Sequence, residues 1–474
     1  MAAPDEATTV LDAAPGVDSA IAVSRALFRS APVVLVATEA DRAGIAEAAT
    51  LGTEIGAPVL LYPHREGPQR TAWQRELGRL APGTVLAVGA AAAASVRESV
   101  RESVRASEAG VSVRTVGPDD RAAAADIPAV KPRPVELTLL VARSRDDAAA
   151  VATARAAGAE VVTVSGADPR ADAKAIAALR AAPTRTVLAL GSEFGPPARL
   201  ENRLATAAHG AQLPGGGQVV LAGRRIVCLY GHPGTRSLGV LGEQGIDASI
   251  ARAKRMAGAY RPFSDVPVVP AFEIIATVAQ GAPGPDGDFS GESSVGELRP
   301  WVDKARKAGL YVVLDLQPGR SDLLRQARRY EPLLRLPHVG LAVDPEWKLG
   351  PRQRPLGQIG GIEAAELNRT SAWLAGLTAR HTLPQKLFVI HQFRLSMIRH
   401  EAALNTSHDE LSLLIHMDGQ GSTGQKNSTW RSVVAARPRN LPLGWKNFYD
   451  EDHPMLTPRQ TMAKRPTPVM ISYQ

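Results

Sequence analysis

The stretch VGLAVDPEW, residues 339–347, is an apolar run that stops abruptly at two carboxylates and an indole. The apolar run at residues 339–343 has the composition of a strand that is buried on both faces. Pro345 cannot donate a hydrogen bond to a sheet, so we expect the strand to end here. The pattern therefore predicts a buried strand whose end presents Asp344, Glu346 and Trp347 to a ligand.

Seven further apolar runs in the second half of the chain also end in polar or glycine residues. They cover residues 225–234, 266–278, 310–319, 386–393, 411–421, 441–448 and 468–474. Amphipathic stretches such as 296–309 and 361–381 separate most of them. Eight β-then-α units over about 250 residues have the size of a (β/α)8 barrel. We therefore predict a TIM-type barrel, the catalytic domain, over residues 221–474.

Polar side chains gather at the predicted strand ends, where barrels of this class place their active sites. Nearly every end offers a group that can hold a hydroxyl-rich ligand. The candidate substrate-binding residues are Tyr230, His232, Glu273, Gln317, Trp347, His391, Gln392, His416, Trp445 and Tyr473. Their number at these positions indicates a ligand site rather than chance placement.

Paired carboxylates at the strand ends are what glycosidic cleavage requires. One carboxylic acid protonates the leaving oxygen, and a second carboxylate acts as nucleophile or base. Side chains alternate along a strand, so we expect Asp344 and Glu346 to point to the same face. Glu346 is the candidate acid, Asp344 would tune it or orient substrate, and Asp315 or Asp418 would be the partner. We expect Glu346→Gln and Asp344→Asn to abolish activity.

The first part of the chain predicts two Rossmann-like α/β units, at residues 1–127 and 134–217. Apolar strands alternate with Ala-rich helical patterns, as in a parallel sheet covered on both faces. The strands of the first unit are APVVLVAT, APVLLYP and GTVLAVG, and those of the second are VELTLLVAR, AEVVTVSG and RTVLALG. No G-x-G-x-x-G motif occurs here, so we predict no dinucleotide cofactor and no other cofactor.

This order of elements resembles the cell-wall-binding repeat type 2 of Gram-positive surface proteins. The resemblance rests on the string APVVLVATEADRAGIAEAATLGTEIGAPVLLYP and on the third strand ending in Val-Gly, and it spans roughly residues 18–200. The second unit matches more loosely, with GAEVVTVSG in place of the G-A-P-x-L-L string. The resemblance implies a module that binds wall polymer on an exported protein.

The second part resembles (β/α)8-barrel glycoside hydrolases, without matching a particular family. The D-x-E end of the fourth strand, VLDLQPG and IHMDGQG carry this resemblance. It implies a glycosidase that acts on cell-envelope polysaccharide. The usual Glu after strand seven is replaced by GWKNFYDED, and aromatic content is 4%. The alternative is therefore a non-catalytic carbohydrate-binding or scaffold protein with a degenerate barrel.

The remaining features of the sequence bound the class of protein and its location. A net charge of +8 over 474 residues and the lack of nucleic-acid-binding motifs predict no nucleic-acid partner. Cys228 is the only cysteine, which excludes an intramolecular disulfide. No H-x-H or H-E-x-x-H spacing occurs, so we expect no metal, although a metal-dependent hydrolase is a third, weaker alternative.

The expected location follows from the wall-binding resemblance. The first residues, MAAPDEATTVLDAAPG, form no signal peptide, and no window is apolar enough for a membrane span. We expect an extracellular or cell-envelope protein whose leader has been removed. A cytoplasmic location is expected if the wall-binding resemblance fails.

Overall fold

The computed structural model describes residues 4, 6–89, 96–100, 111–117, 124, 126–127, 134–143, 146–182, 185–439 and 441–474. The chain divides into two compact units, Met1–Ala208 and His209–Gln474. The sequence PAVKPRP, residues 128–134, is a candidate linker from its Pro content, and all of it except residue 134 lies outside the described residues. The division at residues 127 and 134 stays a prediction. None of the described helices is both long and apolar enough to span a membrane.

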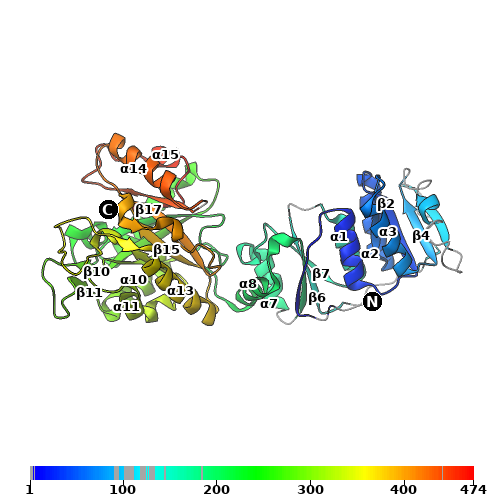
Figure 1. Cartoon of the computed structure of the whole chain (residues 1–474), viewed down its shortest axis with the longest axis horizontal. Helices are drawn as coiled ribbons and strands as arrows, with labels where there is room; N and C mark the ends of the chain where they lie inside the picture. The colour runs from blue at the N-terminus through cyan, green and yellow to red at the C-terminus, as the bar shows by residue number, and fades with distance from the viewer. Residues whose placement is uncertain are drawn as a thin grey trace. The chain divides into compact units, whose positions relative to one another are not determined.

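The second unit is a mixed α/β fold built on a closed barrel of eight parallel strands (Figure 1). Closure is complete because the first strand pairs in parallel with both the second and the last. In barrel order the strands are β9 (Arg225–Gly231), β10 (Val268–Ala279), β12 (Tyr311–Leu316), β13 (Val339–Val343), β15 (Lys386–His391), β17 (Leu411–Met417), β18 (Leu443–Asn447) and β19 (Met470–Tyr473). Each coincides with one of the eight predicted runs, so the predicted barrel is confirmed.

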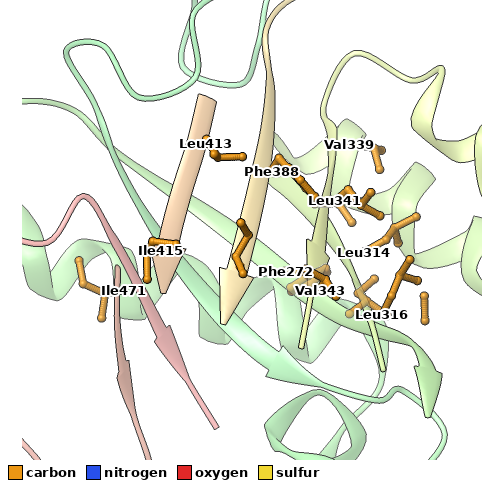
Figure 2. Close-up of a cluster of buried hydrophobic side chains, with 14 of the residues drawn as sticks. Phe272, Leu314, Leu316, Val339, Leu341, Val343, Phe388, Leu413, Ile415 and Ile471 are labelled. Atoms are coloured by element: carbon orange, nitrogen blue, oxygen red, sulfur yellow. The ribbon is translucent and has the colours of Figure 1, made fainter. Parts of the chain in front are cut away.

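Side chains alternate between two apolar layers along each barrel strand. The outer layer packs against the surrounding helices, and Figure 2 shows part of it, including Leu341, Phe388 and Ile415. The inner layer fills the barrel where the strands begin, and it includes Cys228 and Val389. Because both layers are apolar at these positions, the strands read as continuous hydrophobic runs.

Helices cover the barrel in most of the connections between strands. They are α9 (Ile246–Tyr260), α10 (Val295–Ala308), α11 (Leu323–Arg329), α12 (Glu331–Leu334), α13 (Ala364–Arg380), α14 (Thr423–Ala436) and α15 (Pro458–Met462). The described connection from β15 to β17 differs from the predicted repeat, because it contains short 3-10 turns and β16 (Ile398–Arg399) in place of an α-helix. Asn405 accepts a hydrogen bond from Ser407 N in this segment, a local turn that competes with helix formation.

The first unit contains two parallel four-stranded sheets among its described residues. One consists of β3 (Val59–Tyr62), β2 (Val33–Thr38), β4 (Thr84–Val88) and β5 (Ser112–Val116). The other consists of β1 (Thr8–Leu11), β8 (Thr186–Leu190), β6 (Leu137–Ala142) and β7 (Glu160–Val164). The first strand of the chain thus pairs with β8 in the second sheet, which strand patterning did not predict.

The helices of this unit pack in part between its two sheets. They are α1 (Val17–Leu27), α2 (Arg42–Ile55), α3 (Pro68–Leu80), α6 (Ala148–Ala156), α7 (Ala173–Ala181) and α8 (Pro197–His209). Buried residues from α1, α2 and α6 share one core. The Thr153 hydroxyl on α6 also donates to Val59 O at 3.2 Å and accepts from Val59 N at 2.9 Å. One buried hydroxyl thus ties the helix of one half to a strand of the other.

Helix α10 begins with a reciprocal capping box that offers a stability test. Ser294 Oγ accepts from Glu297 N at 3.2 Å, and Glu297 accepts from Ser294 N at 2.6 Å. Ser294→Ala is expected to lower the free energy of unfolding by about 1 kcal/mol, because a helix N–H loses its partner. Urea denaturation measures this loss. Ser432→Ala, at an exposed position within α14, is the control, and an equal change in both variants would contradict the capping role.

Candidate active site

The inward-facing positions of the barrel strands change from apolar to polar residues toward the carboxyl ends of the strands. Two residues beyond the apolar inner position, most barrel strands carry a polar side chain that faces the barrel axis. Cys228, Ala271, Val313 and Val389 are thus followed by Tyr230, Glu273, Asp315 and His391. The same spacing places His416 on β17 and Lys446 on β18. The charged groups therefore gather at the carboxyl ends of the strands because the period of a strand is two.

A cavity of about 210 Å³ opens above this layer. Of the residues predicted for the site, six line it: Tyr230, Gln317, Asp344, Glu346, Trp347 and Asp418. Lys446, Phe393, Gln420 and Phe448 line it as well and were not predicted. The cavity thus combines several carboxylates, one ammonium group and aromatic rings, a composition suited to a polar ligand with apolar ring faces.

Asp344 and Glu346 reach this cavity by a route that differs from the expected strand alternation. Strand β13 stops at Val343, and Pro345–Trp347 forms a 3-10 turn with Asp344 as its N-cap. Asp344 Oδ1 accepts from Glu346 N at 3.3 Å. Gly360 packs on this turn, donating its N–H to Glu346 O at 2.7 Å, and a Cβ there would lie 2.5 Å from that oxygen. The turn, and not the pleat of the strand, therefore positions Glu346.

His391 is the centre of a buried ionic network beneath the cavity. Its Nε2 lies 2.9 Å from Glu273 Oε1 and 3.9 Å from Asp315 Oδ1, and its Nδ1 lies 3.0 Å from Asp418 Oδ2. Both ring nitrogens therefore donate, which requires the imidazolium form. Burial disfavours this cation, but the charges of Glu273 and Asp315 outweigh burial and raise the pKa of His391 well above 6.5.

His416 stacks on His391 but is neutral, whereas His391 is a cation. The ring centroids lie 5.2 Å apart with an interplanar angle of 17°. Burial and then the charge of His391 lower the pKa of His416 well below 6.5. Its Nε2 lies 3.0 Å from Ser472 Oγ. Gly444 on the neighbouring strand leaves room for this ring, because a Cβ there would lie 2.9 Å from His416 Cδ2. His416 is thus a neutral spacer beside a cation.

Two of the carboxylates that line the cavity have opposite pKa shifts. Burial and then the charge of Asp418 raise the pKa of Glu346 to about 7. Burial also opposes ionisation of Asp418, but the hydrogen bond from His391 and its charge outweigh burial and hold the pKa of Asp418 below 3.8. Glu346 is therefore about half protonated near pH 7 and mostly protonated below it, while Asp418 stays ionised down to the acidic range. Such a split is the arrangement required of a general acid and its partner.

Of the other two predicted catalytic carboxylates, Asp344 lines the cavity and Asp315 lies beneath it. Burial and then the charges of Glu346 and Asp418 raise the pKa of Asp344 well above 3.8. Asp315 is fully buried and does not line the cavity. Burial raises the pKa of Asp315 to about 6, with His391 opposing the shift, and Tyr230 donates to Asp315 Oδ2 at 2.9 Å. Asp315 therefore supports Tyr230 and His391 from below.

Several predicted substrate-binding residues lie away from the cavity lining. Trp445 is fully buried in the outer layer, packs edge-on against Trp430 at 5.5 Å, and donates to Asn447. Tyr473 is buried, with its hydroxyl 2.6 Å from that of Tyr260. These two residues are one position out of step with the inward-facing Lys446 and Ser472. Alternate residues of a strand share one face, so counting two positions from the inward-facing Gly444 leads to Lys446 and not to Trp445.

The remaining predicted residues sit below or beside the cavity. Glu273, His391 and His416 form its buried support, as described above. Gln392 faces away from the axis and donates to Glu401 Oε2 at 2.8 Å. His232 accepts from Gly234 N at 2.9 Å and lies 3.1 Å from Ser293 Oγ, and burial lowers the pKa of His232. Its role in the structure is to organise the loop after β9.

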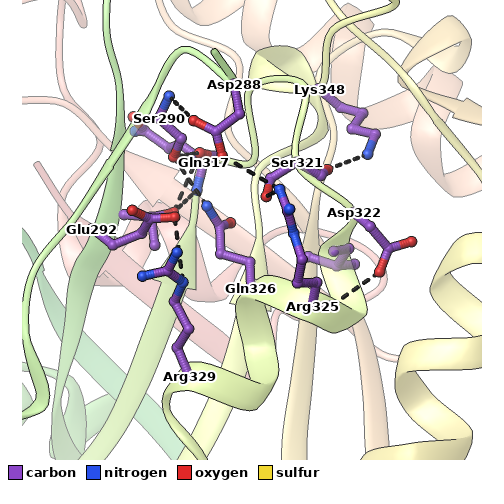
Figure 3. Close-up of polar contacts among 12 residues, drawn as sticks. Asp288, Ser290, Glu292, Gln317, Ser321, Asp322, Arg325, Gln326, Arg329 and Lys348 are labelled. Carbon is purple, nitrogen blue, oxygen red and sulfur yellow. Dashed lines mark hydrogen bonds and ion pairs between the residues drawn. The ribbon is translucent and has the colours of Figure 1, made fainter. Parts of the chain in front are cut away.

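A second polar network stabilises the segment between β10 and α10 (Figure 3). This segment forms β11 (Ser290–Glu292), which pairs antiparallel with the end of β10. Ser290 Oγ donates to Gln317 O at 2.8 Å and accepts from Gln326 at 3.0 Å. Gln317 in turn accepts from Ala279 N at 2.9 Å. These bonds fasten the segment to the barrel beside Gln317, which lines the cavity.

One group of carboxylates in the described residues has the spacing of a metal site, and it lies in this segment. Ligand oxygens of Asp286, Asp288 and Glu292 lie within 4.8 Å of one another. Two arginines accompany them: Arg325 lies 3.9 Å from Asp288, and Arg329 lies 3.6 Å from Glu292. The two arginines offset part of the charge of these three acids.

The fold and site define a closed parallel α/β barrel with a carboxylate-lined cavity at the carboxyl ends of its strands. No family model and no curated protein matches the chain. Two solved structures are similar in part. Cwp8 from Clostridium difficile matches 48% of this chain and 40% of that chain at 16% identity, with a TM-score of 0.22. Cwp6 from Clostridium difficile matches 72% of this chain and 63% of that chain at 12% identity, with a TM-score of 0.34. The chain thus covers less than two thirds of each neighbour, and TM-scores this low carry no inference on fold or function.

Proposed function

We propose that the barrel is a glycoside hydrolase that acts on cell-envelope polysaccharide, with Glu346 as the general acid. The observation that carries this proposal is that Glu346 and Asp418 line one cavity, where their surroundings raise the pKa of Glu346 and lower that of Asp418. Glycosidic cleavage requires this pair, because the leaving oxygen must gain a proton while positive charge develops on the sugar ring.

The mechanism assigns one step to each group. Glu346 gives its proton to the glycosidic oxygen as the bond to the anomeric carbon breaks. Asp418 either attacks that carbon or removes a proton from the attacking water. His391 keeps Asp418 ionised and in place through its hydrogen bond of 3.0 Å. Trp347, half-buried at the cavity, offers a ring face on which a sugar can stack.

Asp344 takes the tuning role in this proposal, not a second proton-transfer role. Its raised pKa favours the neutral form, and its Oδ1 accepts a hydrogen bond from the backbone N–H of Glu346. An Asn side chain retains that acceptor and is neutral as well. This changes the expectation for Asp344→Asn, which we now expect to retain most of the activity.

The first unit is proposed to bind wall polymer and to hold the barrel at the cell envelope. The support is the resemblance of its sequence to cell-wall-binding repeats, together with its two parallel sheets. We likewise propose two Rossmann-like halves divided near residues 127 and 134. Co-sedimentation of the full chain with insoluble cell walls tests the binding: the chain is expected in the pellet, and a chain that stays in the supernatant would remove the proposal.

The rival proposal is a carbohydrate-binding barrel without catalysis. It is favoured by one observation: strand β18 presents Lys446 to the cavity where a carboxylate was expected from the resemblance. Under this alternative, wall-derived oligosaccharides would bind the barrel and be recovered intact after prolonged incubation. Mass spectrometry of the bound fraction separates the two proposals.

The pH dependence of hydrolysis tests the assigned charge states. Activity requires protonated Glu346, whose pKa is raised to about 7, so kcat/KM is expected to fall as pH rises through about 7. It also requires ionised Asp418, whose pKa is lowered, so the acidic limb is expected below pH 3.8 unless unfolding intervenes. Release of reducing ends from cell-envelope polysaccharides between pH 3 and 9 measures both limbs. A rate that is flat from pH 6 to 9 would exclude Glu346 as the acid.

A further inference from the structure

Lys446 is a buried lysine that no part of the proposed mechanism uses. It follows the inward-facing Gly444 on β18, is 3% exposed, and lines the cavity. Its Nζ lies 3.5 Å from the centroid of the Tyr230 ring and 5.2 Å from that of Phe448. The ammonium group thus lies against ring faces at the wall of the cavity, among the groups that would surround a bound sugar.

The partners of Lys446 differ from those of the other deeply buried lysines in the barrel. Lys386 donates to Leu336 O and Val339 O at 2.9 and 2.8 Å. Lys426 donates to Lys446 O at 2.7 Å and also pairs with Asp452. Among the residues that the structure describes, Lys446 Nζ has ring contacts but no hydrogen bond and no carboxylate oxygen within 4.0 Å. Elsewhere this fold gives its buried ammonium groups hydrogen-bond acceptors from the chain itself. Lys446 Nζ instead borders the cavity, where the charges of Asp418 and Glu346 act on it without direct contact, so its donors are open to a ligand.

A cation–π contact alone is a weak substitute for the hydrogen bonds that an ammonium group makes. Such contacts contribute roughly 0.5–2 kcal/mol, whereas removing an ion from water costs several kcal/mol. The charges of Asp315 and Asp418 offset part of this cost from a distance. An anion delivered through the cavity adds what they do not, a charge and acceptor oxygens in direct contact with Nζ. A neutral hydroxyl supplies acceptor oxygens without the charge.

We propose that Lys446 binds a monoanionic group, a carboxylate or a phosphodiester, carried by the sugar that occupies this cavity. The inference rests on the proposed function, in which a saccharide binds beside Glu346 and Asp418, and it narrows the substrate class to acidic polysaccharides. The anion contacts Nζ on the Tyr230 side of the cavity. The sugar ring is then free to lie toward Trp347, because Tyr230 and Trp347 both line the same cavity.

Isothermal titration of the full chain with small probes tests this assignment. Glucuronate and glucuronamide share the same sugar ring and a planar group of the same size, but only glucuronate is charged and only glucuronamide carries N–H donors. The methyl phosphodiester of glucose at O6 is the phosphate probe. Wild type is expected to bind one of the two anionic probes about 10–100-fold more tightly than glucuronamide, the range of a hydrogen bond to a charged group. The anionic probe that binds more tightly identifies whether the sugar carries a carboxylate or a phosphodiester. Equal affinity for all three probes would overturn the proposal.

Two variants assign the preference to Lys446 itself. Lys446→Met is expected to lose the preference for the anion, and Lys446→Arg to keep most of it. Lys464→Met is the matched control, because Lys464 also lies over a ring, 4.8 Å from that of Trp445, but does not line the cavity. Preserved discrimination in Lys446→Met would overturn the assignment. If that variant does not fold, as judged by circular dichroism, Lys446→Gln takes its place, because it keeps a polar side chain but lacks the charge, and preserved discrimination in it would likewise overturn the assignment.

The same variants separate this inference from the proposed hydrolysis. A wild-type chain that prefers the anion but cleaves no polysaccharide supports the anion site and contradicts the hydrolase. A chain that cleaves neutral and acidic polysaccharides with equal kcat/KM, in wild type and in Lys446→Met alike, supports the hydrolase and contradicts the anion site.

Discussion

Glu346→Gln is expected to reduce kcat on the cleaved polysaccharide about 10²–10⁴-fold, the contribution of a positioned general acid. The amide keeps the size and polarity of the side chain but has no acidic proton that it could transfer to the leaving oxygen. The fold raises the pKa of Glu346 to about 7 and so disfavours its ionised form. Removing that carboxylate therefore costs no stability above pH 7, and the variant is expected to unfold at or above the wild-type temperature. Initial rates and thermal unfolding of the same preparation measure both effects.

Two matched variants make the Glu346 result specific. Glu363→Gln changes a carboxylate that pairs with Arg399 on the barrel exterior, outside the cavity lining, and should leave kcat unchanged. Asp344→Asn should lower kcat less than about tenfold, because Asp344 is already neutral. A loss in Asp344→Asn as large as that in Glu346→Gln would transfer the acid role to Asp344. Full activity in Glu346→Gln would end the hydrolase proposal.

His391→Leu is expected to destabilise the barrel by about 3–5 kcal/mol at pH 7, the cost of breaking a buried ion pair by removing one partner. His391 contacts Glu273, Asp315 and Asp418, and the first two carboxylates are fully buried. Leu has a similar volume but leaves these charges without their cation. Urea denaturation at pH 7 measures the loss, and adding Glu273→Gln to the variant should recover part of it, because one unpaired carboxylate is then absent.

The pH dependence of stability identifies the charge on His391. Its folded-state pKa is raised above the unfolded value, so its contribution is fully present below pH 6.5 and is lost as pH rises through the folded-state pKa. Wild type should show this fall, and His391→Leu should lack it. His338→Gln is the control: burial lowers the pKa of His338 to about 4, so this buried histidine is neutral at pH 7. A loss in His391→Leu no larger than that in His338→Gln would contradict the ionic role.

The barrel was predictable because its signal is local. Each strand is an apolar run bounded by polar residues, and eight such runs with intervening helical patterns have one common closed arrangement. The fifth connection departs from the pattern, since the segment between β15 and β17 lacks an α-helix among its described residues. Likewise, the pairing of β1 with β8 joins residues far apart in the chain, and no local pattern specifies that contact.

The site was predictable only to the level of the strand ends. Six predicted residues line the cavity, whereas Trp445 and Tyr473 were chosen for their ring chemistry and lie one position out of step with the inward face. Lys446 was missed for the same reason. Counting by two from the apolar inner residues separates the faces of a strand, because consecutive side chains project to opposite sides of the sheet.

The sequence by itself determined the eight strands and the presence of carboxylates at the strand ends, because these follow from residue type and spacing along one strand. Only the tertiary structure decided which groups share the cavity and which are charged. His391 pairs with Glu273 across 118 positions of the chain, and Tyr230 with Asp315 across 85. The physical reason is that a pKa depends on burial and on the distances between charges. Both quantities arise only when the strands close into a barrel.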